Sequence, residues 1–167
     1  TLGAHVEHFS AGPVAAAHAT LTPSQKELGS LLIDIGAGTT KIAIFEENRL
    51  SHVAVIPVGG ANITNDLAIG LRIPIEVAET VKLSYGSALA KEVSARDAIE
   101  LSKIDARARG TITKKFIAEI IEDRLAEIFE LVNNEVKRIG KISQLPAGVV
   151  LVGGTAKMPA ITELARQ

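Results

Sequence analysis

One segment of the sequence constrains the fold more than any other: an apolar run that ends in an acid and a glycine-rich turn. Residues 30–35 are almost continuously apolar, as in a strand covered on both faces of a sheet, and Asp34 stands near their end. The turn Gly-Ala-Gly-Thr-Thr follows at residues 36–40. β-Branched and aromatic residues recur through residues 41–45, which predicts a second strand. The segment is therefore predicted to be a β-hairpin that turns on glycines.

The strand after the turn separates this segment from two common phosphate-binding designs. In P-loop and dinucleotide-binding folds, the glycine turn leads directly into a helix. Glycine still lets backbone N–H groups approach a ligand closely, and consecutive N–H groups can cradle phosphate. Asp34 could hold Mg²⁺ through its waters. The pattern favours a phosphate-contacting hairpin, and the alternative is an ordinary tight hairpin in which Asp34 is a surface or turn acid.

A second glycine turn lies near the end of the chain. Residues 149–152 are apolar and precede Gly153 and Gly154, and a helix is expected from about Pro159. Such a turn can press its backbone against a base or a ribose, but strand–Gly–Gly–helix units also turn corners in many α/β proteins. Because both strands are predicted to be buried, a single sheet could bring the two turns to one cleft.

The remaining pattern predicts an α/β fold. A strand over residues 50–58 completes a three-stranded meander, and residues 149–152 add a further strand. Residues 94–110 are mixed and polar, and we expect a small hairpin there. Helical spacing of apolar residues predicts three helices, one that carries Ile63, Leu67 and Leu71, one that starts at Pro74, and the longest from Thr113 to about Gly140.

Composition places the chain among ordinary globular proteins and excludes several kinds of site. Of its 167 residues 47% are hydrophobic and none is cysteine, which excludes disulfides and thiolate metal sites. Eighteen Lys and Arg offset 19 Asp and Glu, so no nucleic-acid partner is expected. No apolar run approaches the ~20 residues of a membrane span. The chain starts at Thr1 without a Met and stops at Gln167 within an expected helix, so we expect a segment of a longer, cytoplasmic protein.

The hairpin and several other stretches resemble the FtsA family of bacterial cell-division proteins. Residues 32–40, Leu-Ile-Asp-Ile-Gly-Ala-Gly-Thr-Thr, are similar to the second phosphate motif of the superfamily that includes actin, heat-shock chaperones and sugar kinases. Within that superfamily the details are similar to FtsA over almost the whole chain, in residues 21–29, 56–60, 63–66, 79–88 and 146–154.

The resemblance implies the C-terminal half of an actin-like ATPase fold. That half has a sheet-based nucleotide-binding lobe, here residues 1–73 and 146–167, and an inserted helix-rich subdomain, here residues 74–145. It further implies ATP and Mg²⁺ as cofactors, with weak or no hydrolysis, and no catalytic residue is assigned. The implied cofactor-binding residues are Asp34 near the metal, Gly36, Ala37, Gly38, Thr39, Thr40 and Lys41 around the phosphates, Glu79 and Lys82 at the ribose or adenine edge, and Gly153, Gly154 and Thr155 against the nucleoside.

Two of these assignments carry alternatives. Glu79 and Lys82, one turn apart on an expected helix, could simply be a solvent-exposed pair worth roughly a few tenths of a kcal/mol. The family usually has an aspartate where this chain has Lys41. A cation there could meet a phosphate or point to solvent. The departure therefore bears on the metal geometry and on any hydrolysis.

The resemblance also implies a role at the inner face of the cytoplasmic membrane. FtsA proteins tether and organise the ring of the tubulin-like division protein FtsZ and bind the FtsZ C-terminal tail on the inserted subdomain. A basic cluster beside the helix over residues 113–140 suits an acidic tail and comprises Arg107, Arg109, Lys114 and Lys115. Self-association is expected of the full-length protein, and membrane contact only through parts absent from this chain.

Other functions stay open at the level of sequence. The same superfamily includes small-molecule kinases and PilM-type pilus-assembly scaffolds, and a plain interaction domain without a ligand is a further alternative. The basic cluster itself could be no more than a solvated face, which is what most runs of charge are.

Overall fold

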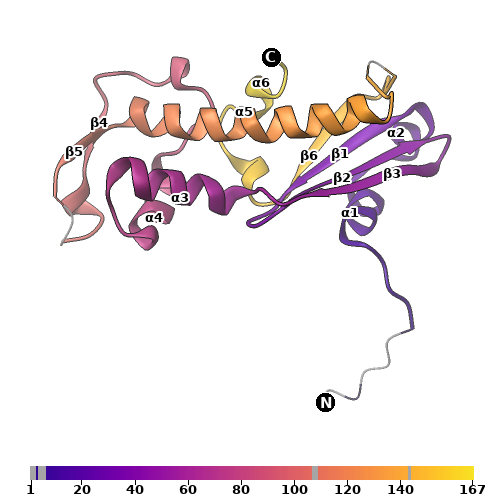
Figure 1. The fold of residues 1–167 in the computed structure, drawn as a ribbon, viewed down its shortest axis with the longest axis horizontal. Helices are drawn as coiled ribbons and strands as arrows, with labels where there is room; N and C mark the ends of the chain where they lie inside the picture. The colour runs from indigo at the N-terminus through magenta and orange to yellow at the C-terminus, as the bar shows by residue number, and fades with distance from the viewer. Residues whose placement is uncertain (1–2, 4–6, 107–108, 143) are drawn as a thin grey trace.

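The computed structural model shows a sheet at one end of the molecule and a group of helices at the other (Figure 1). It describes residue 3 and residues 7–106, 109–142 and 144–167. The longest helix, α5 (Lys114–Arg138), runs along both parts. Within the described residues, no helix is both long enough and apolar enough to cross a membrane.

Four strands form the main sheet, in the order β3-β2-β1-β6. β1 (Ser30–Ile35), β2 (Thr40–Glu46) and β3 (Arg49–Ile56) make an antiparallel meander, and β6 (Val149–Val152) pairs with β1 in parallel. The predicted meander with one added strand is confirmed, although the third strand ends two residues earlier than expected. The parallel pairing matters for function because it brings the ends of β1 and β6 to one edge of the sheet.

Alternate residues of β1 point into two separate cores, which explains its continuous apolar run. Leu32 joins a smaller core with Ala17 of α1 (Gly12–Thr20), on the face where α2 (Pro23–Leu28) also contacts β2. The other face carries the main core beneath α5 and includes three further β1 residues, Leu31, Ile33 and Ile35. The hairpin that carries the glycine turn is thus held from both sides.

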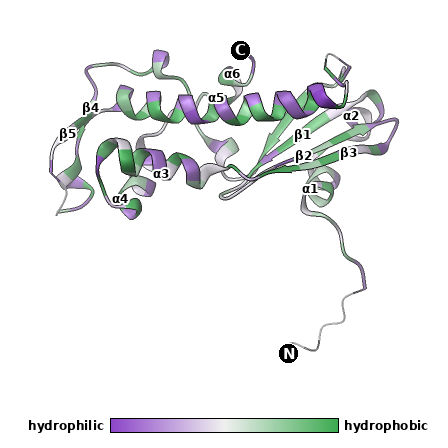
Figure 2. Ribbon diagram, viewed as in Figure 1, coloured by the Kyte–Doolittle hydropathy of each residue, from purple (hydrophilic) through white to green (hydrophobic). Residues whose placement is uncertain are grey.

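The helical part is built around α5. α3 (Gly60–Leu71) and α4 (Ile75–Tyr85) pack against each other and against α5, and α5 also reaches β3. Hydrophobic and hydrophilic residues alternate along α5 (Figure 2). Six residues of its predicted apolar seam are buried, and the seventh, Ile139, follows the end of the helix and is half-buried. The buried six are Ile117, Ile121, Leu125, Ile128, Val132 and Val136. The long helix therefore shares one core with the sheet and with the two shorter helices.

The last helix is present but is short. The four-residue α6 (Ile161–Leu164) starts two residues after the expected Pro159 and follows a 3-10 turn, η3 (Thr155–Lys157). Ala160 separates them, because its left-handed φ of 62° does not fit a helix.

The segment between α4 and α5 contains the expected hairpin. β4 (Ala98–Glu100) pairs with β5 (Thr111–Thr113) in an antiparallel two-stranded sheet. The division of the chain into lobes at residues 73/74 and 145/146 stays a prediction.

Candidate functional site

The two glycine turns meet at one edge of the main sheet, as the sequence predicts. Asp34 of β1 lies opposite Val152 of β6 in the parallel register, so both strands end at the same place. Gly153 has a φ of +93°, and a Cβ atom added there would lie 2.5 Å from the carbonyl oxygen of Ile35 and 2.6 Å from Oδ1 of Asp34. Only glycine allows this approach of the two turns.

The carbonyl groups of the first turn face the start of α3. The N–H of Gly60 donates to the carbonyl of Gly36 at 2.9 Å, and the N–H of Ala61 donates to the carbonyl of Ala37 at 2.7 Å. A Cβ at Gly59 would lie 2.7 Å from both carbonyl oxygens. The turn and the first residues of α3 are therefore in direct backbone contact, which two successive glycines permit.

Three N–H groups of the same turn have no acceptor among the described residues. Gly36 donates its N–H to the carbonyl of Thr39 at 2.9 Å, which closes the turn. The next three N–H groups, of Ala37, Gly38 and Thr39, donate to no acceptor in the part of the chain that the structure describes. Ala37 and Gly38 are exposed. Three successive unpaired N–H groups at an exposed turn form an arrangement that binds anions such as phosphate.

Lys82 of α4 connects this site to α3. Its Nζ lies 2.7 Å from Oε2 of Glu79, 2.7 Å from Oγ1 of Thr64 and 3.1 Å from the carbonyl oxygen of Gly60, and its side chain is only 11% exposed. Thr64 also donates its hydroxyl to Glu79. Burial raises the pKa of Glu79, but the bonds from Lys82 and Thr64 and the charge of Lys82 outweigh it and lower the pKa overall. The pair is therefore more than a surface ion pair.

These groups surround one cavity of about 290 Å³. Six of the residues predicted from sequence line it: Gly36, Ala37, Glu79, Lys82, Gly154 and Thr155. Five further residues line it that the sequence argument did not name as site residues: Gly60, Leu83, Lys157, Met158 and Pro159. All five lie close to a sequence signal: Gly60 belongs to a glycine pair, Leu83 follows Lys82, and the other three come two to four residues after Thr155.

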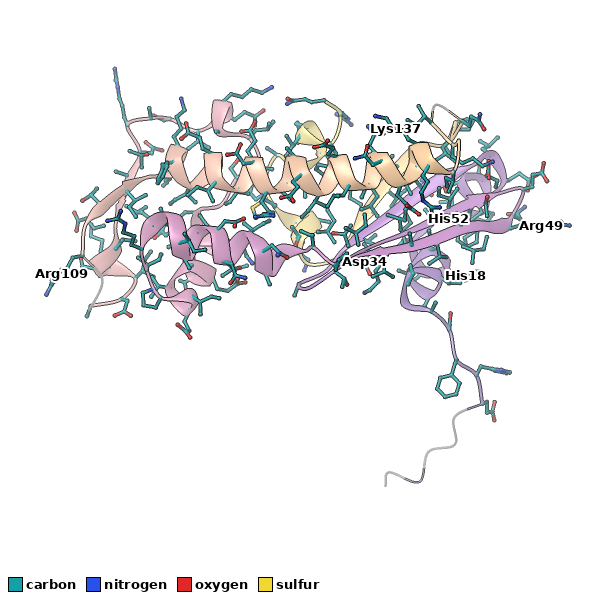
Figure 3. All side chains as sticks on the ribbon, in the orientation of Figure 1. His18, Asp34, Arg49, His52, Arg109 and Lys137 are labelled. Carbon is teal, nitrogen blue, oxygen red and sulfur yellow. The ribbon has the colours of Figure 1, made fainter. Side chains whose placement is uncertain are left out.

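The other predicted residues lie beside this cavity. Thr40 is fully buried, and its hydroxyl donates to the carbonyl of Val58 at 2.8 Å, so it braces the hairpin. Lys41 lies opposite Asp34 in the β1–β2 register, with Nζ 3.5 Å from Oδ2. Gly38, at the exposed tip, has no atom within 4 Å of an added Cβ. Figure 3 shows Asp34 where the strands converge toward α3.

The donor set for a metal is poor. Among the described residues, no three His, Asp or Glu side chains come close enough together to hold a metal ion. Asp34 is the predicted metal residue, and its carboxylate is already ion-paired with Lys41. The free N–H groups thus fit phosphate, whereas the side chains do not fit a tightly held Mg²⁺.

A larger groove of about 720 Å³ lies elsewhere, between α5, β6 and α6. Apolar side chains such as Phe129, Val136 and Leu145 contribute to its lining, and neither glycine turn nor Lys82 does. Its described lining residues include no three successive N–H groups without an acceptor, so the smaller cavity is the better candidate for a nucleotide.

The predicted basic cluster is only partly described. Arg107 lies outside the described residues. Arg109 is exposed at the end of the molecule farthest from the main sheet (Figure 3). Nζ of Lys114 lies 4.0 Å from Oδ2 of Asp97 and 5.8 Å from the centre of the Tyr85 ring. Lys115 is half-buried.

Proteins of known structure share this fold. MreB5 of Spiroplasma citri bound to AMPPNP matches 90% of this chain and 49% of its own, with a TM-score of 0.72 and 24% identity. The ethanolamine utilization protein EutJ of Carboxydothermus hydrogenoformans matches 93% of this chain and 45% of its own, with a TM-score of 0.65 and 26% identity. The PilM–PilN type IV pilus biogenesis complex matches 92% of this chain and 35% of its own, with a TM-score of 0.61 and 20% identity. The fold is that of the actin-like ATPases.

Sequence comparison is more specific. The family model described as "Cell division protein FtsA" matches residues 31–167. FtsA of Pseudomonas aeruginosa is 42% identical over 99% of this chain and 40% of the relative, and FtsA of Bacillus subtilis is 43% identical over 98% and 37%. FtsA of Escherichia coli K12 is 31% identical over 99% of this chain and 41% of the relative. The chain spans roughly two-fifths of the length of these relatives, and it belongs to the FtsA family of cell-division proteins.

Proposed function

We propose that this chain is the ATP-binding part of an FtsA protein that organises the FtsZ ring. The observation that carries the proposal is the set of three free N–H groups at the first turn, adjoining the cavity that the second turn and the Lys82 cluster also line. MreB5, which shares the fold, was solved with AMPPNP bound. That likeness supports a nucleotide and not another anion.

Each part of ATP has a matching set of groups in this proposal. The N–H groups of Ala37, Gly38 and Thr39 bind phosphate oxygens, because they have no other acceptor in the described residues. Glu79 accepts from a ribose hydroxyl. Gly154 leaves room for the nucleoside, since an added Cβ there would meet no atom within 4 Å. The cavity, at about 290 Å³, accommodates part of a nucleotide.

Binding with weak or no hydrolysis is the expected chemistry. A general base needs a free carboxylate or imidazole whose pKa lies near neutrality. Glu79 is the acid that lines the cavity, but Lys82 and Thr64 hold it, and its pKa is lowered. It is therefore suited to orient a hydroxyl and poorly suited to remove a proton.

Mg²⁺ enters this proposal only as a cation that the nucleotide brings with it. Its ligands would be phosphate oxygens and water, because the Asp34 carboxylate is already paired with Lys41 and the described side chains form no metal site.

The partner and the location follow from the family. FtsZ is the proposed partner, with its acidic C-terminal tail on the helical part beside α5, where Arg109, Lys114 and Lys115 lie. Self-association and attachment to the inner face of the membrane are proposed for the full-length protein. A PilM-type scaffold is the weaker alternative, since that likeness is at 20% identity and the FtsA relatives reach 43%.

A glycine variant tests nucleotide binding without disturbing the fold. Gly154→Val places a side chain in the cavity, and the open space at this position makes the change cheap for the folded state. Gly12→Val is the matched control, because an added Cβ there also meets nothing within 4 Å, far from the cavity on α1. Calorimetric titration with ATP should show binding by the original chain and by Gly12→Val, and at least about tenfold weaker binding by Gly154→Val. Equal affinity in all three would refute the placement of the nucleotide.

A further inference from the structure

Lys41 and Asp34 form an ion pair across the hairpin that carries the phosphate turn. The two residues are directly opposite in the antiparallel register, and Nζ of Lys41 lies 3.5 Å from Oδ2 of Asp34. Their side chains are 33% and 19% exposed, so the pair is partly shielded from water. The other oxygen, Oδ1, faces the second turn at Gly153. The carboxylate is thus held between an ammonium group and the second glycine turn.

This pairing changes what the site can attract. An ammonium group beside a carboxylate cancels most of the charge that would draw a divalent cation, and it repels the cation itself. Among the described residues, no group of three acids or histidines compensates for that loss. A lysine has three N–H donors, and among the described residues Asp34 is the ion-pair partner of Lys41. The donors that Asp34 does not take can bind a phosphate oxygen, and Lys41 directly follows the glycine turn in the sequence.

We propose that Lys41 serves as the built-in cation of this site. The ammonium group stands in the place of a divalent cation beside Asp34, so the chain holds no Mg²⁺ at Asp34 and binds ATP without it. The part of this inference that concerns ATP rests on the proposed function. The part that concerns the metal rests only on the ion pair, and it is tested without any nucleotide.

Electron paramagnetic resonance of Mn²⁺ tests the metal part directly. Asp34→Asn should leave the Mn²⁺ binding of the original chain unchanged, because the inference places no metal at Asp34. Lys41→Asp places two carboxylates on opposite residues of adjacent strands, and it should gain Mn²⁺ affinity by about tenfold or more. Lys41→Asp combined with Asp34→Asn should lose that gain. Lys137→Asp, the same charge change at an exposed position of α5, is the control and should behave as the original chain. Binding of Mn²⁺ by the original chain that depends on Asp34 would overturn the inference.

Titration with ATP, in excess Mg²⁺ and in EDTA, tests the nucleotide part. The original chain should bind ATP with affinities that agree within about threefold in the two conditions. Lys41→Met removes the ammonium without adding an acid and should lose about tenfold or more in EDTA. An original chain that binds ATP only with Mg²⁺ would contradict the inference. If it binds ATP in neither condition, the proposed function fails, and the Mn²⁺ measurement still decides the role of Lys41.

Discussion

Replacing Lys82 by methionine tests how the nucleotide site is joined to the helical part. The lysine holds three oxygen acceptors, of Glu79, Thr64 and Gly60, from a side chain that is 11% exposed. Methionine keeps most of the apolar stem and removes the ammonium, so lost packing contributes little. The variant isolates the polar contacts.

The cost follows from those contacts. A hydrogen bond to a charged group contributes about 1.5–3 kcal/mol, and leaving a buried partner unpaired costs a similar amount. Glu79 is 44% exposed, so water replaces much of what it loses, and the net destabilisation should be about 2 kcal/mol. For a domain of this length, that lowers the melting temperature by about 4–8 °C.

Thermal unfolding followed by circular dichroism measures this shift, and a double-mutant cycle assigns it. Glu79→Gln alone should cost about 1 kcal/mol, and in the Lys82→Met background it should cost nothing, because the unpaired carboxylate is then removed. The reasoning is refuted if Lys82→Met melts within about 1 °C of the original chain, or if the two changes are additive.

Two further predictions concern the ion pairs that fix α5. Hydrogen bonds from Arg138 and His52 lower the pKa of Glu135 to about 2, so its contribution to stability is present above pH 4.5 and is lost as the pH falls towards 2. Urea unfolding should show that Glu135→Gln lowers the free energy of unfolding by about 1 kcal/mol at neutral pH. Below pH 4.5 the variant should lose stability less steeply than the original chain. Arg124 binds Asp66 of α3 with Nε–Oδ2 of 2.6 Å and Nη2–Oδ1 of 3.0 Å, and Arg124→Met should cost about 1–2 kcal/mol in the same assay; unchanged stability would count against this pair.

The sequence predicts the frame of this molecule because its pattern is strong there. The apolar run of β1 indicates burial on both faces, and the structure gives it two cores. The seam of α5 follows from regular spacing. The meeting of the two turns follows from two apolar strands that each lead into a glycine turn, since neighbouring parallel strands end at one edge; β1 is buried as predicted, whereas β6 is half-buried, with Val149 exposed.

What the sequence could not predict are contacts made by side-chain direction and by tertiary packing. Thr39 and Thr40 look alike in the motif, yet the hydroxyl of Thr40 donates a hydrogen bond to the carbonyl of Val58. Thr64 lies in a stretch that resembles the family, but its contact with Lys82 could not be predicted, because that contact depends on how α3 and α4 pack. The pairing of Lys41 with Asp34, by contrast, could have been predicted, because the length of the turn fixes the register once the hairpin is assumed.

The contact between the first turn and α3 is made by peptide groups alone, through the carbonyls of Gly36 and Ala37 and the N–H groups of Gly60 and Ala61. Its strength therefore depends on the path of the main chain and not on side-chain chemistry. A ligand that tightens or opens the turn shifts the first turn of α3 directly, without side-chain rearrangement. Because α3 packs on α4 and α5, a shift at the proposed nucleotide site would reach both of these helices through it.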